Sequence, residues 1–249
     1  MSQVTGHRSQ IEGQKSKVEG QKHLAVSVLR FAFGLLLSAM SYQLSAISFA
    51  QSATEISKQV QANLDKSPWE ATITGKVQLP DGSSQEAEFK LQVIPGKEQI
   101  ARVDFAKPSS LEGNFVLISD KEVWNYLFLT NQVIIQPRAK AKVEGLGVNL
   151  TSLGDFGELT EKVDARVMGE QSTPEGPAWK LVGRAKDSTL GFAEGEFLVL
   201  KSDPRPVLLR IKDASGKVLA ELNFKNFKRS NATSKTLKKY PADAEVVKK

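Results

Sequence analysis

The sequence predicts an α+β fold that is mainly antiparallel β. One strongly curved sheet is expected to form an incomplete barrel, or half-barrel, covered by short helices. Two observations lead to this prediction. From Trp69 onward, about ten segments alternate apolar and polar residues, and short turns containing Gly, Pro, Asp or Asn join most of them. By contrast, 52–66 has a helical period, and 143–163 interrupts the alternation with glycine-broken helical turns.

The first 50 residues are not expected to belong to this fold. Residues 1–22 are rich in Gln, Ser, Lys and Glu and read as a disordered polar extension. Residues 23–50 have a basic flank, a short apolar stretch and the small residues Ser48 and Ala50, as in a secretory signal peptide. The apolar stretch is shorter than the roughly 20 residues of a membrane span. We therefore expect cleavage after Ala50, a periplasmic location and a single domain over 51–249.

The domain begins with a predicted amphipathic helix over 52–66. Ile56, Val60 and Leu64 recur at every fourth position, and Thr54 is the expected N-cap. After this helix the period changes to two.

The strands follow in meander order. The alternating segments 69–79 and 86–94 flank a Pro-Asp-Gly-Ser turn and predict a hairpin. Clean alternation makes one sheet face polar, so that Glu194 and Glu196 are expected to face solvent. The apolar face must be buried, either by helices that fill the interior or around a cavity open to an apolar guest. Further strands are expected over 99–106, 113–119, 122–130, 131–137, 165–171, 178–186, 191–201, 207–214 and 218–229, with an edge strand in the tail 238–249.

The charge argues against a nucleic-acid partner. The chain carries 34 Lys and Arg against 28 Asp and Glu, a formal net charge of +6. Five of these bases and two of these acids precede residue 51, which leaves the expected domain at +3. So small a charge, spread along alternating strands, is not typical of a nucleic-acid-binding surface.

The composition also argues against catalysis. Cys is absent, and both histidines, His7 and His23, precede the expected cleavage point. The mature domain would lack the commonest general base, the thiol nucleophile and the commonest metal ligands. No phosphate-binding glycine loop or serine-nucleophile elbow is found. We therefore expect a protein that is not an enzyme and requires no cofactor or metal.

The order of the motifs resembles the bacterial outer-membrane lipoprotein carrier and sorting family, the periplasmic LolA type and its outer-membrane relative LolB. The resemblance covers Thr54–Val247 and includes the helix, the 69–79 strand and the late segment 203–229. It is carried in particular by Ser119, Asp120, Trp124, Tyr126, Gln132, Val133, Tyr240, Pro241, Val246 and Val247.

The resemblance implies a half-barrel whose apolar concave face accepts lipoprotein acyl chains beneath a helical lid. It further implies passage from an inner-membrane release complex to an outer-membrane acceptor. Because no cysteine is present to carry a lipid anchor, the soluble carrier is favoured over the anchored acceptor.

The candidate ligand-binding residues are large apolar side chains on the strands and in the 143–163 insertion. As a set they could line a cavity, since aromatic rings give a large contact area with few polar groups to satisfy. Taken singly, ordinary core packing is the favoured interpretation of each. These residues are Trp69, Ile73, Phe89, Leu91, Phe105, Trp124, Tyr126, Leu146, Leu150, Leu153 and Phe156.

The favoured function is a monomeric envelope carrier that holds lipoprotein acyl chains, or other lipid, in an apolar cavity and moves them toward the outer membrane. The first alternative is a regulatory domain of the same fold that senses lipid or a protein partner. The second is a structural β-domain with a filled interior and no ligand.

Overall fold

The computed structural model describes residues 51–79, 81–97, 99–141, 161–186 and 190–249. All of them belong to one compact unit, Gln51–Lys249. The expected polar extension, the signal peptide and most of the 143–163 insertion lie outside the described residues.

Helix α2 (Ala53–Leu64) opens the unit, as the sequence predicts. The predicted N-cap is wrong by two residues: Ser52, not Thr54, caps the helix. The Ser52 hydroxyl accepts from the Glu55 backbone N–H, and the Glu55 carboxylate accepts from the Ser52 N–H, which satisfies two backbone donors reciprocally. The apolar stripe of Ile56, Val60 and Leu64 is buried.

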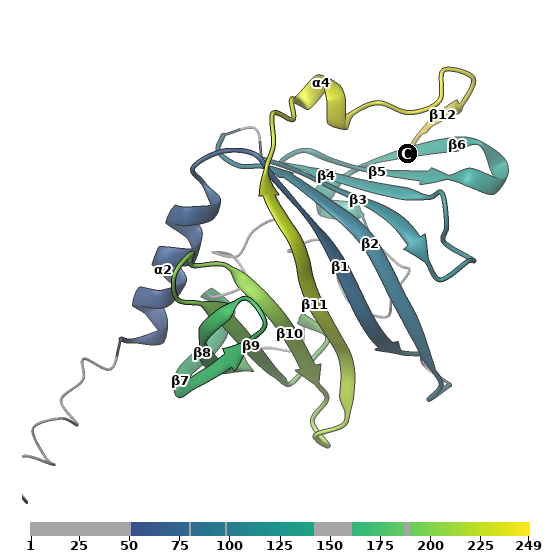
Figure 1. The fold of residues 1–249 in the computed structure, drawn as a ribbon. Helices are drawn as coiled ribbons and strands as arrows, with labels where there is room; N and C mark the ends of the chain where they lie inside the picture. The colour runs from purple at the N-terminus through teal and green to yellow at the C-terminus, as the bar shows by residue number, and fades with distance from the viewer. Residues whose placement is uncertain (1–50, 80, 98, 142–160, 187–189) are drawn as a thin grey trace, which may run out of the picture. The chain divides into compact units, whose positions relative to one another are not determined.

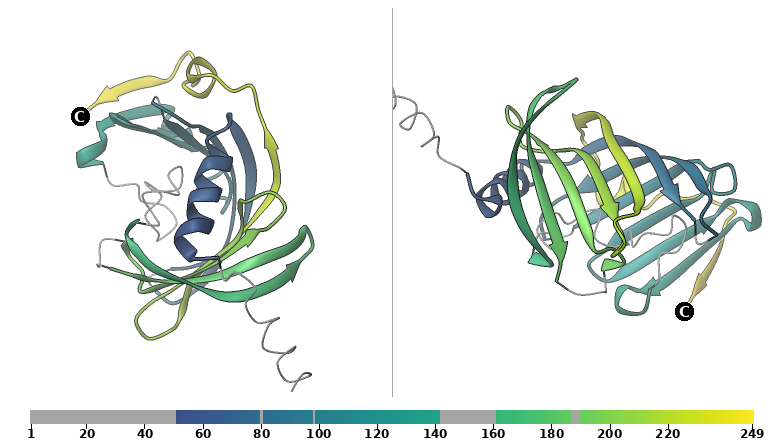
Figure 2. Two further views of the ribbon diagram at one scale, coloured as in Figure 1. Left: turned by 90° about the vertical axis from the view of Figure 1, so that its left-hand side faces the viewer. Right: turned by 90° about the horizontal axis from the view of Figure 1, so that it is seen from below.

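The strands form one sheet in the order β12-β6-β5-β4-β3-β2-β1-β11-β10-β9-β8-β7. All neighbours are antiparallel except β12, which runs parallel to β6. The sheet curves strongly and does not close, which confirms the predicted half-barrel (Figure 1; Figure 2). The strands are β1 (Trp69–Gln78), β2 (Ser84–Ile94), β3 (Ile100–Lys107), β4 (Phe115–Ser119), β5 (Glu122–Leu127), β6 (Gln132–Pro137), β7 (Val163–Thr173), β8 (Gly176–Ala185), β9 (Glu194–Leu200), β10 (Pro206–Lys212), β11 (Val218–Arg229) and β12 (Glu245–Lys248).

Three short helical turns complete the described part of the chain. Two are 3₁₀ turns on either side of β6, η1 (Phe128–Thr130) and η2 (Arg138–Lys140). The third, α4 (Ser234–Leu237), links β11 to the final strand and was not predicted from the sequence.

Successive residues of each strand point to opposite faces of the sheet, so the curved sheet has a concave face and an outer face. The main buried cluster collects the concave-face residues together with α2. A second cluster lies on the outer face beneath the C-terminal segment, and we call it the outer-face cluster. It comprises Ile100, Phe115, Leu117, Tyr126, Val133, Ile135 and Leu237.

Ion pairs cover much of the remaining outer face. Glu196 lies there, but its side chain is only 9% exposed, so the prediction that it faces solvent is wrong. The cause is cross-strand pairing: Lys180 on β8 and Arg210 on β10 each hold its carboxylate at 3.2 Å. Lys180 and Arg210 thus cover the Glu196 carboxylate, which the alternation pattern alone had predicted to be exposed to solvent.

Glu70 is the centre of a second outer-face ion pair group. Its carboxylate lies 2.9 Å from Lys90 Nζ on β2 and 3.0 Å from Lys228 Nζ on β11. The hydrogen bond from Lys90 is the main reason that the pKa of Glu70 lies below its ordinary value of 4.5. A lowered folded-state pKa contributes stability that is present above pH 4.5 and is lost as the pH falls through the folded-state pKa.

We expect Glu70→Gln to lower the free energy of unfolding at pH 7 by on the order of 0.5 kcal/mol, because partly exposed ion pairs are weak. The deficit should shrink as the pH falls below 4.5. Urea denaturation at pH 7 and at a series of lower pH values measures this loss of unfolding free energy. Glu112→Gln, which changes an exposed residue, is the matched control. A deficit that does not change with pH would contradict this account.

Candidate functional site

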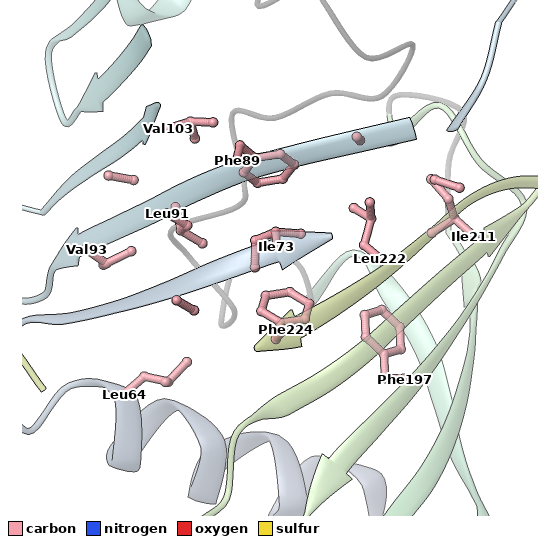
Figure 3. Packing of buried hydrophobic residues seen from close by; sticks show 14 of the residues in the cluster. Leu64, Ile73, Phe89, Leu91, Val93, Val103, Phe197, Ile211, Leu222 and Phe224 are labelled. Atoms are coloured by element: carbon pink, nitrogen blue, oxygen red, sulfur yellow. The ribbon is translucent and has the colours of Figure 1, made fainter. Parts of the chain in front are cut away.

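The concave face is built from cross-strand apolar contacts that the strand register fixes. Ile73 on β1 lies opposite Phe89 on β2, and Phe89 lies opposite Phe105 on β3. The Phe89 and Phe105 rings are 6.0 Å apart in a tilted arrangement. Ala71, Leu91 and Val103 form the next such row, so the apolar face continues unbroken across three strands (Figure 3).

The same face continues across the other half of the sheet. Phe224 on β11 lies opposite Ile73. Leu222 is paired with Leu209 on β10, and Leu209 with Phe197 on β9. Figure 3 shows Ile73, Phe89, Leu222, Phe224 and Phe197 projecting to the same side of the sheet. Strands far apart in the sequence therefore share one apolar surface.

Helix α2 covers one end of this surface. Ile56, Val60 and Leu64 belong to the same buried cluster as the concave-face residues. Figure 2 (left) shows the helix lying on the concave side of the curved sheet, beside β7–β9. Its polar face turns away from the cluster, as expected for an amphipathic helix with one buried stripe.

The concave face is lined by apolar side chains, and the buried polar group that its described residues show is the indole N–H of Trp69, which has no hydrogen-bond partner. The other buried polar or charged side chains of the described part of the chain lie elsewhere: Asn63 is in the last turn of α2, Ser119 begins the β4–β5 turn, Glu196 is on the outer face and Arg205 precedes β10. No group of three metal-ligating side chains occurs in the described ranges. None of the described helices is long and apolar enough to span a bilayer. The described side chains of this face are therefore mainly apolar.

The structure brings together the predicted residues from the first three strands. Trp69, Ile73, Phe89, Leu91 and Phe105 all lie in the concave cluster, each less than 8% exposed. Trp179 packs at the edge of the same cluster. Leu146, Leu150, Leu153 and Phe156, the predicted lid residues, lie outside the described residues.

Trp124 and Tyr126 are not on the concave face, and their predicted position is wrong. They share a face with each other, as alternation requires, but Trp124 is paired with Leu117 and Tyr126 with Phe115 in the outer-face cluster. Val123 is the β5 residue that reaches the concave cluster. Alternation within one strand shows which residues share a face, whereas only the pairing register shows which face that is.

Sequence reasoning also missed several concave-face residues on the last strands. Phe197, Leu209, Leu222 and Phe224 were assigned to predicted strands without being singled out. Their alternation was visible in the sequence, but their position opposite Ile73 depends on the pairing of the first strand with the eleventh. No local signal reports such a long-range pairing.

The outer-face cluster is covered by the C-terminal segment, which Arg102 holds in place. Its Nη1 donates to the carbonyl oxygens of Leu237 (2.6 Å) and Lys239 (2.7 Å), while Nε donates to Asp104 at 2.9 Å. The guanidinium also lies 3.8 Å from the centre of the Phe115 ring. Trp124 packs edge-on against Tyr240 at 6.0 Å, so its contacts are those of a structural residue.

We expect Arg102→Ala to release the C-terminal segment and to lower the free energy of unfolding by about 2 kcal/mol, since it removes charge-assisted hydrogen bonds from a largely buried group. Hydrogen–deuterium exchange of residues 237–249 measures the release. Arg166→Ala, which removes an exposed arginine from β7, is the control. Unchanged protection of the C-terminal segment would contradict the assigned role of Arg102.

Fold and site together define a class: an unclosed antiparallel half-barrel with an apolar concave face. No family model and no curated protein matches the sequence. Among solved structures, an uncharacterized conserved protein from Thermus thermophilus is 42% identical, with 79% of this chain and 99% of that chain covered and a TM-score of 0.60. The chain belongs to the family of that protein.

Other solved structures are similar to this chain at lower sequence identity. MucB from Pseudomonas aeruginosa, solved with MucA, is 16% identical over 78% of this chain and 63% of that chain, with a TM-score of 0.50. A LolA superfamily protein from Nitrosomonas europaea is 13% identical over 76% and 98%, with a TM-score of 0.41. The unclosed, mainly antiparallel half-barrel expected from the sequence is the fold observed.

Proposed function

We propose that the protein is an exported, monomeric carrier that holds the acyl chains of lipoproteins, or of another lipid, on its concave face and moves them toward the outer membrane. The observation that carries the proposal is the continuous apolar surface of the concave face, with no charged side chain buried among its described residues, on a sheet that does not close. Such a surface binds hydrocarbon by burial alone and performs no reaction.

The energetics fit reversible binding. Each buried methylene contributes about 0.8 kcal/mol, so a chain of about 16 carbons contributes roughly 12 kcal/mol before costs. Association and ordering cost about 4–15 kcal/mol. One chain is therefore held with moderate affinity. Two or three chains together would be held tightly enough that release requires a change in the surface that covers them or an acceptor that competes for the cargo.

The proposal is tested with the purified mature domain, N-phenyl-1-naphthylamine as an apolar fluorophore and a synthetic diacylated lipopeptide as competitor. We expect the fluorophore to bind and the lipopeptide to displace it. In a second assay, the protein should accelerate transfer of a fluorescent lipopeptide between two populations of phosphatidylglycerol–phosphatidylethanolamine vesicles. Binding without transfer would favour the sensor function over the carrier function, and absence of binding would overturn both lipid-based functions.

A further inference from the structure

Lysine side chains gather on one region of the outer face, and we call this region the lysine patch. It takes in the outer side of β1, β2 and β11 around Glu70 and the segment that links β11 to β12 through α4 (Figure 1). The chain has no acidic residue between Glu221 and Asp243, the stretch that supplies most of the patch. The patch comprises Lys90, Lys225, Lys228, Lys235, Lys238 and Lys239.

The strand register places three of these lysines close to one another. Thr72, the next outer-face residue after Glu70 on β1, lies opposite Lys90 on β2 and opposite Lys225 on β11. Lys228 lies opposite Glu70 itself. Since neighbouring strands are about 4.8 Å apart, the backbones of β2 and β11 lie roughly 10 Å apart on either side of β1. This spacing is close to the Debye length of about 8 Å at physiological ionic strength, so the lysine charges act together.

The Glu70 carboxylate lies beneath the ammonium groups that it holds. One of its oxygens lies 2.9 Å from Lys90 Nζ, and the other lies 3.0 Å from Lys228 Nζ. The Glu70 side chain is 12% exposed, whereas the side chains of Lys90 and Lys228 are 47% and 69% exposed. Glu70 therefore orders two lysines and offsets one charge, while the lysines remain the groups that meet solvent.

Arg102 brings the other three lysines to the same face. It lies on β3, in the cross-strand row of outer-face residues that also contains Glu70 and Lys228. Its hydrogen bonds to the carbonyl oxygens of Leu237 and Lys239 hold the α4 segment at the end of that row. The lysines of this segment therefore extend the group that surrounds Glu70.

The charge of the lysine patch is not balanced. Its six lysines are accompanied by one acid, Glu70, because the charge of Arg102 is offset by Asp104 at 2.8 Å. The patch therefore has a formal charge of +5. Since residues 51–249 together carry +3, the remainder of this range has a formal charge of −2. The small net charge of the domain thus conceals a strongly uneven distribution.

Several cations elsewhere on the outer face have carboxylate partners. Lys107 pairs with Glu86 at 2.9 Å, and Lys212 pairs with Glu194 at 3.0 Å. Such pairs leave little field beyond the surface. The exposed patch lysines that form no ion pair with a carboxylate of the described ranges are Lys225, Lys235 and Lys239.

We propose that the lysine patch docks the protein on an anionic lipid surface, such as a bilayer that contains phosphatidylglycerol. Each lysine close to such a surface tightens binding about fivefold. An acidic protein partner fits less well, because protein interfaces are enriched in arginine and aromatic residues and depleted in lysine. The inference goes beyond the proposed function, since it concerns the outer face and requires no lipid on the concave face.

Co-sedimentation of the mature domain with large vesicles tests the proposal. The vesicles consist of phosphatidylcholine alone or of phosphatidylcholine with one third phosphatidylglycerol. We expect binding to the anionic vesicles only, and its loss in about 1 M NaCl, where the screening length falls to about 3 Å. Equal binding to both kinds of vesicle would place the contact on an apolar surface and overturn the proposal, as would absence of binding to either.

Two triple variants of equal net charge test where the contact lies. The first changes exposed lysines of the patch: Lys225→Gln, Lys235→Gln and Lys239→Gln. The second, the matched control, changes exposed lysines elsewhere: Lys58→Gln, Lys186→Gln and Lys217→Gln. The patch variant should bind the anionic vesicles about a hundredfold more weakly, and the control nearly as well as the unaltered protein. Equal weakening by both would assign the binding to net charge and overturn the proposal.

Glu70→Gln removes the acid of the patch and should tighten binding to the anionic vesicles several-fold. Glu112→Gln makes the same change in net charge at an exposed position outside the patch and should leave binding unchanged. Weaker binding by Glu70→Gln than by Glu112→Gln would show that the charge of the patch does not hold the protein on the surface. Displacement of N-phenyl-1-naphthylamine reports on the concave face, so the carrier function and this proposal can fail independently.

Discussion

Gly75→Ala is expected to lower the free energy of unfolding by about 3 kcal/mol or more, a large share of the roughly 5–15 kcal/mol that stabilises a typical domain. A Cβ on Gly75 would lie 1.8 Å from the Glu221 carbonyl oxygen and 3.0 Å from the Leu222 Cα. Both are backbone atoms of β11, so relief requires that β1 and β11 separate. This pair joins the two halves of the sheet, β1–β6 with β12 on one side and β7–β11 on the other.

Urea denaturation followed by tryptophan fluorescence measures the effect. Gly183→Ala on β8 is the matched control, since its added Cβ would meet the Val163 Cβ and Cγ2 at 3.2 Å, a much milder overlap than the 1.8 Å approach at Gly75. We expect the control to cost about 1 kcal/mol, clearly less than Gly75→Ala. If the two variants are equally stable, the close approach of β1 and β11 is not what requires glycine at position 75.

Leu209→Asp is expected to weaken binding of acyl chains on the concave face at least tenfold. Leu209 is half-buried between Leu222 and Phe197, so a carboxylate is tolerated there in the unliganded protein. A bound hydrocarbon chain would strip water from that carboxylate, and burying an unpaired charge is costly. Tenfold corresponds to about 1.4 kcal/mol, a modest part of that cost.

Displacement of N-phenyl-1-naphthylamine by the diacylated lipopeptide measures this loss. Thr72→Asp adds the same carboxylate to the outer face, where Thr72 lies beside Lys90 and Lys225 on the neighbouring strands. It should fold and bind as the unaltered protein does. Equal binding by both variants would place the lipid away from the concave face.

Much of the fold could be predicted from local patterns. The helix at 53–64, the first hairpin and the boundaries of most strands follow from period and turn chemistry. The short turn α4 was missed because four residues leave no periodic signal, and its capping by Thr233 is visible only in the structure. The parallel pairing of β12 with β6 likewise depends on a contact between distant segments.

The candidate site was predictable only in part, for a related physical reason. Residues of the hairpin strands β1 and β2 were placed correctly, since a tight turn fixes their register. Trp124 and Tyr126 were placed on the wrong face of the sheet. Which face their side chains occupy depends on how β5 pairs with β4 and on how the strands before it pair in turn, and the sequence does not show this. The unpaired indole N–H of Trp69 has no sequence signature at all. It becomes visible only when distant strands are assembled.

The central claim is that hydrocarbon lies against the concave face. Photo-crosslinking with a diacylated lipopeptide that carries a diazirine at the acyl terminus, followed by peptide mapping at residue resolution, tests it most directly. We expect labels on alternate residues of β1, β2 and β11, including Ile73, Phe89 and Leu222. Labels confined to outer-face residues such as Phe115 and Val133, or no specific labelling, would contradict the account.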